Sequence, residues 1–455
     1  MPEKRNIVLI TSDSLRADHC SFMGYHRKTT PTIDKMARKG LYFENAIISG
    51  TGTPTSMFGV FTGEYAPNNF ESIKSTFRHY DISDEISSVV LQGKSKITTY
   101  WRREIALRRT LAQILSEKGY DTAAFHANPT LSRFFGFNKG FRIYQDFLFA
   151  NKHNVFINLL DKLRIAKVYR IFRDFIKGEN AFMKWEKLYD YIITWVKNSE
   201  KPFFLWVLLM DTHFPYIPPR KYRKWSNTID IYKLNWRMYK GRFTHPNLNK
   251  KERQKFINIY DDAIYYADAF VSKLWKDLQD YDPVFIIHGD HGDAFGEHGF
   301  YGHPPYLYEE LIHVPLVIYN ADINGKVTKP ISLLQIPSII RYIMNKDGRY
   351  DPLSIVYNNT ADFVISKISP ETFNGKVRIA VRSIEWKLII NQKNEDELYN
   401  LKDDPYEQEN LVGRYPTIAR KMKKIALMHM RKEVEKENIR KKMSALKEKI
   451  IYAGK

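Results

Sequence analysis

Residues 6–14 read NIVLITSDS, a short apolar run that ends in three polar residues. Such an apolar, β-branched run is typical of a strand buried on both faces of a parallel sheet. Open α/β sheets bind their ligands at the carboxyl ends of the strands. The polar residues Thr11, Ser12 and Asp13 lie at that end of this run. The stretch therefore predicts an α/β fold whose site includes the end of this first strand.

The same alternation of elements continues along the chain. Apolar runs predict further strands, and segments with helical spacing or capping residues predict the helices between them. Strands that alternate with helices over this length favour a doubly wound, mostly parallel sheet. The expected strands are 42–48, 121–125, 203–210, 283–288 and the run VPLVIY at 314–319, and the expected helices are 31–39, 56–61 and 110–118.

The composition is that of a folded protein with an excess of positive charge. The 455 residues suffice for one large domain and a smaller one, and 44% of them are hydrophobic. The net charge of +20 indicates either attraction to an anionic partner or a Lys-rich, solvated surface. Sulfated or phosphorylated substrates, nucleic acids and anionic membranes are such partners, but no nucleic-acid-binding motif accompanies the charge.

The cysteine content and the hydropathy pattern bear on the compartment. Cys20 is the only cysteine, so no intrachain disulfide can form, as expected in a reducing compartment. No signal peptide precedes the first strand, and no apolar run reaches the length of a transmembrane segment. We expect a soluble, cytoplasmic protein without a transmembrane anchor.

The densest group of metal-binding residue types is HGDHGDAFGEHG, residues 288–299. Asp290 and His291 follow a buried strand directly, so a carboxylate oxygen and an imidazole nitrogen can reach one divalent ion. The glycines around them permit a tight turn and the close approach of a substrate. A solvated polar turn is the alternative, and the number of His, Asp and Glu residues argues against it.

Other polar residues follow neighbouring predicted strands. Asp13 can supply a second carboxylate, although an isolated Asp in this position is more often a cap or turn residue. His213 lies in MDTHFPY, after the 203–210 strand, and His303 lies in YGHPPYLYEEL, a short loop beyond the Asp-His pair. We assign Asn128 and Asp211, which also follow expected strands, to substrate binding.

A candidate nucleophile lies in GTGTPTSMFGVFTG, residues 50–63. The hydroxyl of Thr53 is expected near the free backbone N–H groups of a helix start, which favour a bound anionic ester. A divalent ion on this oxygen would lower the pKa of the hydroxyl and activate it. A helix cap is the alternative role, and Thr51, Thr55 and Ser56 compete with Thr53 for both.

Taken together, these motifs resemble the sulfatases of the alkaline phosphatase superfamily. The match begins with NIVLITSDSLRADHCSFMGYHRKTTPTIDKMARKG and includes HGDHGDAFGEHG, MDTHFPY and YGHPPYLYEELIHVPLVIY. It continues to the C-terminal segment KLIINQKNEDELYNLKDDPYEQENL, and so runs in order from about residue 5 to residue 412. The resemblance implies an alkaline-phosphatase-like α/β fold with a small C-terminal α+β subdomain.

The resemblance also implies a division of the chain. Residues 1–345 would form the catalytic α/β domain, with possible insertions at 69–108 and 150–200 that shape the substrate pocket. Residues 346–415 would form the small subdomain. Residues 416–455 are Lys- and Glu-rich with Ile, Leu and Met at helical spacing, which indicates a basic helical tail on the surface or, less readily, an oligomer contact.

The resemblance assigns roles to the candidate residues. Asp13, Asp290 and His291 become metal ligands, and Thr53 becomes both nucleophile and ligand. His213 and His303 bind the transferred group, protonate the leaving oxygen or hold a second metal. The oxygen-rich ligand set suits Ca²⁺, Mg²⁺ or Mn²⁺, and additional histidines favour Zn²⁺.

Three positions depart from the usual sulfatase pattern. Thr53 stands where sulfatases have the Cys or Ser that is converted to formylglycine, Met57 replaces an Arg, and Ser14 replaces a second metal-binding Asp. These changes resemble the threonine branch of the superfamily, which includes phosphodiesterases and phosphoethanolamine transferases. Those transferases carry a membrane anchor, which is not seen in this sequence.

The leading hypothesis is a metal-dependent hydrolase of sulfate or phosphate esters, on a small-molecule, glycan or lipid substrate, with Thr53 as nucleophile. The first alternative is a phosphodiesterase or phosphotransferase that forms a phosphothreonine intermediate. The alternative from another class is a non-catalytic anion-binding protein on the same fold. The sequence does not specify an oligomeric state.

Overall fold

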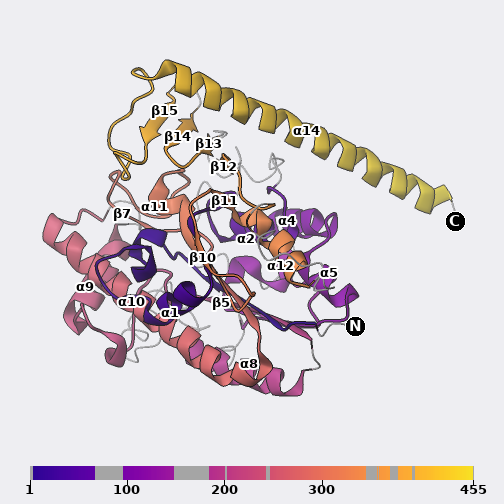
Figure 1. Cartoon of the computed structure of the whole chain (residues 1–455), viewed down its shortest axis with the longest axis horizontal. Coiled ribbons are helices and arrows are strands. Elements are labelled where there is room, and N and C mark those ends of the chain that lie inside the picture. The colour runs from indigo at the N-terminus through magenta and orange to yellow at the C-terminus, as the bar shows by residue number, and fades with distance from the viewer. Residues whose placement is uncertain are drawn as a thin grey trace, which may run out of the picture.

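The computed structural model describes residues 4–66, 96–147, 184–199, 202–241, 246–344, 356, 358–368, 378–391 and 395–453. Its centre is a nine-stranded sheet in this described part of the chain (Figure 1). The strands follow the order β10-β2-β9-β6-β1-β5-β3-β4, and β11 also pairs with β2. The strands are β1 (Ile7–Ser12), β2 (Leu41–Ile47), β3 (Asp121–Phe125), β4 (Ile143–Gln145), β5 (Phe203–Leu209), β6 (Val284–Gly289), β9 (His313–Tyr319), β10 (Gly325–Val327) and β11 (Ile331–Ser332).

The sheet is mixed but mostly parallel, as the sequence predicts. β1 pairs in parallel with β5 and β6, β3 pairs in parallel with β4 and β5, and only β9 runs antiparallel to its neighbours β2 and β6. The side chains of β1 alternate between two cores: Ile7 and Leu9 enter one, and Val8 and Ile10 enter the other. All four are fully buried, which explains the uninterrupted apolar run at the start of the chain.

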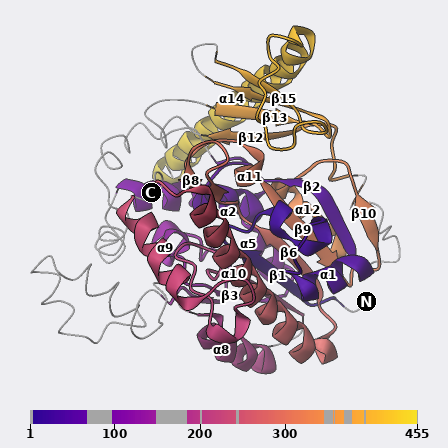
Figure 2. The same ribbon diagram turned by 90° about the vertical axis from the view of Figure 1, so that its left-hand side faces the viewer.

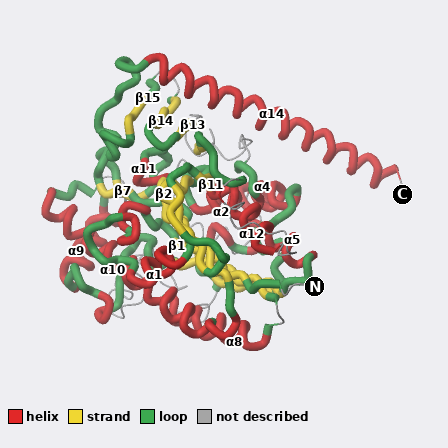
Figure 3. Tube along the Cα trace, in the orientation of Figure 1, coloured by secondary structure: helices red, strands yellow, loops and turns green. Residues whose placement is uncertain are grey.

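Helices cover both faces of the sheet, which Figure 3 shows as strands between two groups of helices. α1 (Pro31–Lys39), α8 (Trp185–Asn198) and α10 (Lys250–Asp277) pack on the face of Val8. α2 (Thr53–Thr62), α4 (Lys96–Ala106), α5 (Leu111–Glu117) and α12 (Ile336–Met344) pack on the face of Ile7. The remaining elements of this domain are α9 (Thr228–Lys240), which packs on α10, α11 (Glu309–Ile312) and the hairpin β7 (Ala294–Phe295) and β8 (Tyr301–Gly302).

A second, antiparallel sheet lies at one end of the molecule (Figure 2). Its strands follow sequence order: β12 (Val364–Ile368), β13 (Arg378–Arg382), β14 (Trp386–Ile390) and β15 (Glu397–Asn400). The long helix α14 (Pro416–Ala453) packs on β13 and β14 through Ala419, Met422 and Ala426. The small C-terminal α+β unit is therefore present, and the expected basic tail is one continuous helix that begins on it.

The second sheet also touches the turn that leads to the candidate nucleophile. The backbone N–H of Lys367 donates to Ser49 O (3.0 Å), and Ser366 Oγ donates to Ile48 O (2.5 Å). The two units therefore share an interface next to the site.

Three expectations need comment. The helix expected from Ser56 begins at Thr53 instead, because Gly52, with a φ of 80°, and Pro54 start it one turn earlier. Of the possible insertions, 96–106 forms α4 and 185–198 forms α8, while 69–95, 150–183 and the boundary at residue 345 lie outside the described residues. Among the helices that are described, none has the length and apolar character needed to span a bilayer.

Candidate active site

The carboxyl ends of five parallel strands meet at one edge of the large sheet. Asp13 follows β1, His213 follows β5, and Asp290 and His291 follow β6. Thr53 follows the turn after β2, and Asn128 follows β3. The site-residue predictions therefore fall where the topology of an open α/β sheet places ligands.

Asp13 is fully buried at the end of β1, and a sharp turn follows it. Ser14 has a φ of 60°, a conformation that is costly for a residue with a Cβ. In this conformation the backbone N–H of Ser14 donates to Oδ1 of Asp290 (3.0 Å). The turn thus ties the ends of β1 and β6 together.

Asp290 and His291 bring a second carboxylate and an imidazole to Asp13. Nε2 of His291 lies 3.5 Å from Oδ1 of Asp13 and 3.7 Å from Oδ2 of Asp290, and all three side chains are buried. Gly292 follows, and a Cβ there would lie 2.0 Å from the carbonyl oxygen of Glu310, so only glycine lets these segments approach. One ligand atom from each of the three residues lies within 4.8 Å of the others, a spacing that suits one metal ion.

Thr53 completes this group from the first turn of α2. Its Oγ1 lies 3.4 Å from Oδ2 of Asp13 and 3.3 Å from Nε2 of His291. The helix cap is Gly52, so the cap role considered for Thr53 is wrong. The hydroxyl faces two predicted ligands at a helix N-terminus, where free N–H groups favour an anion.

A second group adjoins the first through His291. Asp293 is buried, and its Oδ1 lies 2.7 Å from Nδ1 of His303. The buried hydroxyl of Tyr216 donates to Oδ2 of Asp293. The ring of His303 lies 4.4 Å from that of His291 and 5.6 Å from that of His213, centre to centre. Possible ligand atoms of His291, Asp293 and His303 also lie within 4.8 Å of one another.

In the described part of the chain, three buried carboxylates lie beside histidines. Among the described residues, the ion pairs of Asp13, Asp290 and Asp293 are all with His291 or His303. Burial, and next the carboxylate of Asp13, raise the pKa of Asp290 well above its usual value. Burial also opposes ionisation of Asp293, but the neighbouring His303 outweighs it and lowers the pKa of that carboxyl.

The two residues assigned to substrate binding lie in different places. Nδ2 of Asn128 donates to Oδ2 of Asp13 (2.8 Å), so this side chain holds a predicted ligand. Asp211 lies against Trp185 and Glu186 of α8, and burial, together with the charge of Glu186, raises its pKa to about 8. The substrate-binding interpretation of Asp211 does not agree with this position.

The remaining histidines of the HGDHGDAFGEHG motif have structural partners. Nε2 of His288 lies 3.0 Å from Oγ1 of Thr11 inside the sheet, and burial lowers the pKa of His288 to about 4. His298 stacks on Tyr308 at 3.7 Å and pairs with Glu310 (2.7 Å). The motif therefore combines candidate ligands with residues that hold the loop in place.

Sequence reasoning missed Asp293 and Tyr216. Asp293 is the last residue of HGDHGD and shares the spacing of the recognised ligands, so the motif itself carried that signal. Tyr216 lies three residues after His213 and reaches Asp293 only because the segments after β5 and β6 meet in the fold. No local pattern marks such a partner.

Comparisons with known proteins agree with the fold. A family model described as Sulfatase matches residues 5–340. An arylsulfatase of Clostridium perfringens is 23% identical over 452 residues, 90% of each chain. The phosphoethanolamine transferase EptA of Helicobacter pylori is 31% identical over 91 residues, which cover 19% of this chain and 18% of that one. The crystal structure of a phosphonate monoester hydrolase of Agrobacterium radiobacter superposes with a TM-score of 0.67 at 17% identity, over 94% of this chain and 96% of that one.

The strand order and the superposition define the class of the fold, a doubly wound α/β fold of the alkaline-phosphatase-like type. Within that class the chain belongs to the sulfatase family, as the match over residues 5–340 establishes. It is a sulfatase-family hydrolase with the alkaline-phosphatase-like fold and an additional C-terminal antiparallel sheet.

Proposed function

We propose that the protein is a metal-dependent hydrolase of sulfate or phosphate esters that uses Thr53 as its nucleophile. The observation that carries this proposal is the position of the Thr53 hydroxyl, 3.4 Å from Asp13 and 3.3 Å from His291 at the start of α2. A hydroxyl in contact with two metal-binding residue types and a helix N-terminus has what a nucleophile for an anionic ester needs.

The residues proposed to hold the metal are Asp13, Thr53, Asp290 and His291. They fit a divalent cation: Oδ2 of Asp290 is buried without a hydrogen-bond partner in the described structure, and two carboxylates lie side by side. Ca²⁺, Mg²⁺, Mn²⁺ and Zn²⁺ are all compatible with this set. When bound, a divalent ion would lower the pKa of the Thr53 hydroxyl and offset charge on the ester oxygens.

In the proposed reaction, the Thr53 hydroxyl first releases its proton to solvent. Oγ1 then forms a bond to sulfur or phosphorus while the bond to the leaving oxygen breaks. A protonated His213 or His303 donates the proton that the leaving oxygen needs. Water then attacks the threonine ester and its proton returns to the histidine. The Thr53 oxygen leaves as the alkoxide with which the reaction began. The contact of His303 Nδ1 with Asp293 holds this ring for the transfer.

Phosphoryl transfer is the second candidate, with a phosphothreonine intermediate that passes to water or to an acceptor hydroxyl. Two observations favour it. Thr53 is not one of the residue types that sulfatases convert to formylglycine, and His291, Asp293 and His303 form a second group that suits a metal ion. Among the described residues, no lysine or arginine pairs with the third buried carboxylate, that of Asp293. A second divalent ion would also offset the charge of this carboxylate. The segment match to a phosphoethanolamine transferase is consistent with this chemistry.

The test compares three esters with each of the four metals: nitrophenyl sulfate, nitrophenyl phosphate and bis-nitrophenyl phosphate. We expect Thr53→Ala to abolish turnover, whereas Thr51→Ala, which removes a hydroxyl from the same turn, leaves most of it. Turnover that survives Thr53→Ala would exclude the nucleophile assignment. The absence of turnover with every ester and metal would favour a non-catalytic anion-binding protein.

Mass spectrometry of the protein quenched during turnover distinguishes the two candidates. A sulfo or phospho adduct on the peptide that contains Thr53 identifies the transferred group directly. An adduct on another residue would contradict both versions of the proposal.

A further inference from the structure

One face of α14 is fixed to the protein along much of the helix. Ala419, Met422 and Ala426 are buried against the C-terminal sheet. About three turns further along, Glu437 pairs with the buried guanidinium of Arg108 (3.2 Å), and Arg440 pairs with Glu64 (2.6 Å). This row of contacts determines which side of the helix faces outward. Figure 1 shows α14 running away from the C-terminal sheet, with its C-terminal end beyond the other labelled elements.

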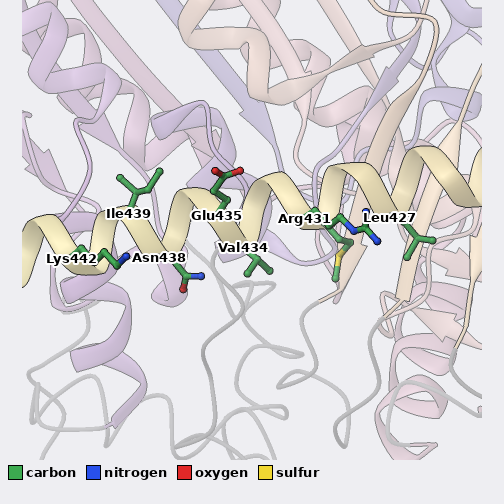
Figure 4. Close-up of a pocket in the computed structure, with 8 residues that line it drawn as sticks. Leu427, Arg431, Val434, Glu435, Asn438, Ile439 and Lys442 are labelled. Atoms are coloured by element: carbon green, nitrogen blue, oxygen red, sulfur yellow. The ribbon is translucent and has the colours of Figure 1, made fainter.

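The outward side carries large apolar residues. Leu427, Met428, Val434, Ile439 and Met443 are each between 51% and 57% exposed. Leu427, Val434 and Ile439 help to line a hollow beside the helix, together with Arg431 and Lys442 (Figure 4). Val434 and Ile439 point to opposite sides of the helix (Figure 4). Single exposed apolar residues are ordinary, but together the five leave apolar surface on both flanks of the helix, beside its basic residues.

The charges of α14 are distributed unequally between its two sides. The helix contains 12 Lys and Arg residues and 4 Glu residues. Glu437 is engaged with Arg108 and Arg440, and Glu433 with Lys436. The exposed residues among the apolar ones are mainly basic, with Glu435 as the acidic exception: Arg420, Lys421, Lys424, Arg431, Lys432 and Lys442. The outward face is therefore both apolar and strongly positive.

We propose that this outward face of α14 docks the protein on an anionic lipid surface. A helix with Leu, Ile, Val and Met among Lys and Arg lies in the plane of a membrane interface, with its apolar side chains below the headgroups and its cations beside the lipid phosphates. Because no described helix can span a bilayer, this is peripheral binding. The proposal does not depend on the chemistry proposed for Thr53.

Two other partners fit the face less well. A second copy of the chain would bring two positive helices together, which costs free energy by like-charge repulsion. A nucleic acid would satisfy the cations but would offer nothing to bury the five aliphatic and thioether side chains against. Lipid satisfies both features, and the net charge of +20 for the whole chain favours the same partner.

The experiment is co-sedimentation of the full-length protein with vesicles. Vesicles of phosphatidylcholine alone are compared with vesicles that also contain phosphatidylglycerol. We expect binding to the anionic vesicles only, weakened by added salt. Each basic residue near such a surface strengthens partitioning about fivefold, the equivalent of about 1 kcal/mol, so the variant Lys424→Gln/Arg431→Gln/Lys442→Gln should bind about 100-fold more weakly.

A matched control separates α14 from the general charge of the protein. The variant Lys35→Gln/Arg38→Gln/Lys39→Gln removes the same charge from exposed positions of α1 and should bind like the unmodified protein. A second variant, Leu427→Gln/Val434→Gln/Ile439→Gln, should lose the binding that persists in high salt. Circular dichroism checks that the variants keep the fold.

Three results would overturn the proposal. The first is equal sedimentation with neutral and anionic vesicles. The second is an equal loss of binding in the α1 and α14 charge variants. The third is binding to a DNA duplex, but not to vesicles, that is unaffected by the apolar substitutions in α14.

Discussion

At the level of single residues, Oδ2 of Asp13 receives hydrogen bonds from both Thr53 and Asn128. Asp13 is a proposed metal ligand, and such a second partner orients its carboxylate. The amide of Asn128 is itself fixed because its Oδ1 accepts from the backbone of Thr130 (2.9 Å). Asn128 therefore acts on the site through Asp13.

Replacement of Asn128 by Ala should weaken metal binding and leave the fold intact. Loss of an outer partner of a ligand typically costs about 10-fold to 100-fold in metal affinity or activity. Titration of the metal against activity measures the change, and a higher metal concentration should restore part of the rate. Ser132→Ala, a buried hydroxyl four residues away, is the control and should leave the metal dependence unchanged. If Asn128→Ala alters only KM for the ester, the side chain binds substrate as the sequence first indicated.

Tyr216 acts on the histidine side of the site through Asp293. Its hydroxyl donates to the carboxylate that pairs with His303, so Tyr216→Phe removes one hydrogen bond and keeps the buried ring. The expected result is a fall in kcat of about tenfold with little change in KM, since the orientation of a proton donor matters most in the transition state. Tyr266→Phe removes a buried phenol hydroxyl that bonds Glu186 and provides the control. Equal rates for Tyr216→Phe and the unmodified enzyme would show that Asp293 needs no such support.

At the level of elements, a buried charge cluster joins the C-terminal sheet to the loop that carries His303. Lys387 of β14 is fully buried and pairs with Glu309 of α11 (3.0 Å) and with Glu407 (2.8 Å). His298, from the HGDHGDAFGEHG motif, contacts the backbone of Glu407 and pairs with Glu310. The second sheet therefore contacts the segments on both sides of the loop that carries His303.

Lys387→Met should destabilise the protein strongly. It leaves the carboxylates of Glu309 and Glu407 buried without their shared cation, and removal of one partner of a buried pair costs about 3–5 kcal/mol. The urea midpoint measures the loss, and Lys387→Met/Glu407→Gln should recover part of it. Lys423→Met breaks the partly exposed pair with Asp396 and should cost less than about 1 kcal/mol. Similar losses in the two lysine variants would mean that the buried cluster is solvated.

The packing of α14 on the body should depend on pH through His429. Its ring contacts Tyr65 at 4.6 Å, and burial lowers the pKa of His429 to about 4. A histidine whose folded pKa is depressed contributes stability above its unfolded pKa of about 6.5, and that contribution is lost as the pH falls toward about 4. We expect His429→Phe to lose less Tm than the unmodified protein between neutral pH and about pH 5. An equal loss in both proteins would assign the acid sensitivity to other groups.

At the level of the whole molecule, the sheet could be predicted because each of its central strands has a local signature. The apolar runs that become β1, β5 and β6 are buried on both faces, and the polar stop after each marks the edge that holds the site. The contacts of Tyr216 and Asn128 could not be predicted, because each depends on how two distant segments approach after folding. The position of Asp211 could not be predicted either. Like His213 it follows β5, but its side chain lies against α8.

Metal binding should also change the thermal stability of the whole molecule. Asp13, Asp290 and Asp293 are buried with histidines as their only ion-pair partners among the described residues, and Asp13 raises the pKa of its neighbour Asp290. A ligand present at about 1,000 times its Kd stabilises the folded state by about 4 kcal/mol, so chelation should lower Tm and re-addition of the bound metal should restore it. The variant Asp290→Asn separates two effects on stability: the gain from bound metal and the cost of the negative charge beside Asp13. It removes both a metal ligand and a like charge. In chelator this variant should unfold at a higher temperature than the unmodified protein, and with metal at a lower one. If instead the variant is less stable under both conditions by the same amount, the carboxylate of Asp290 serves only as an acceptor for the backbone N–H groups of Ser14 and His291.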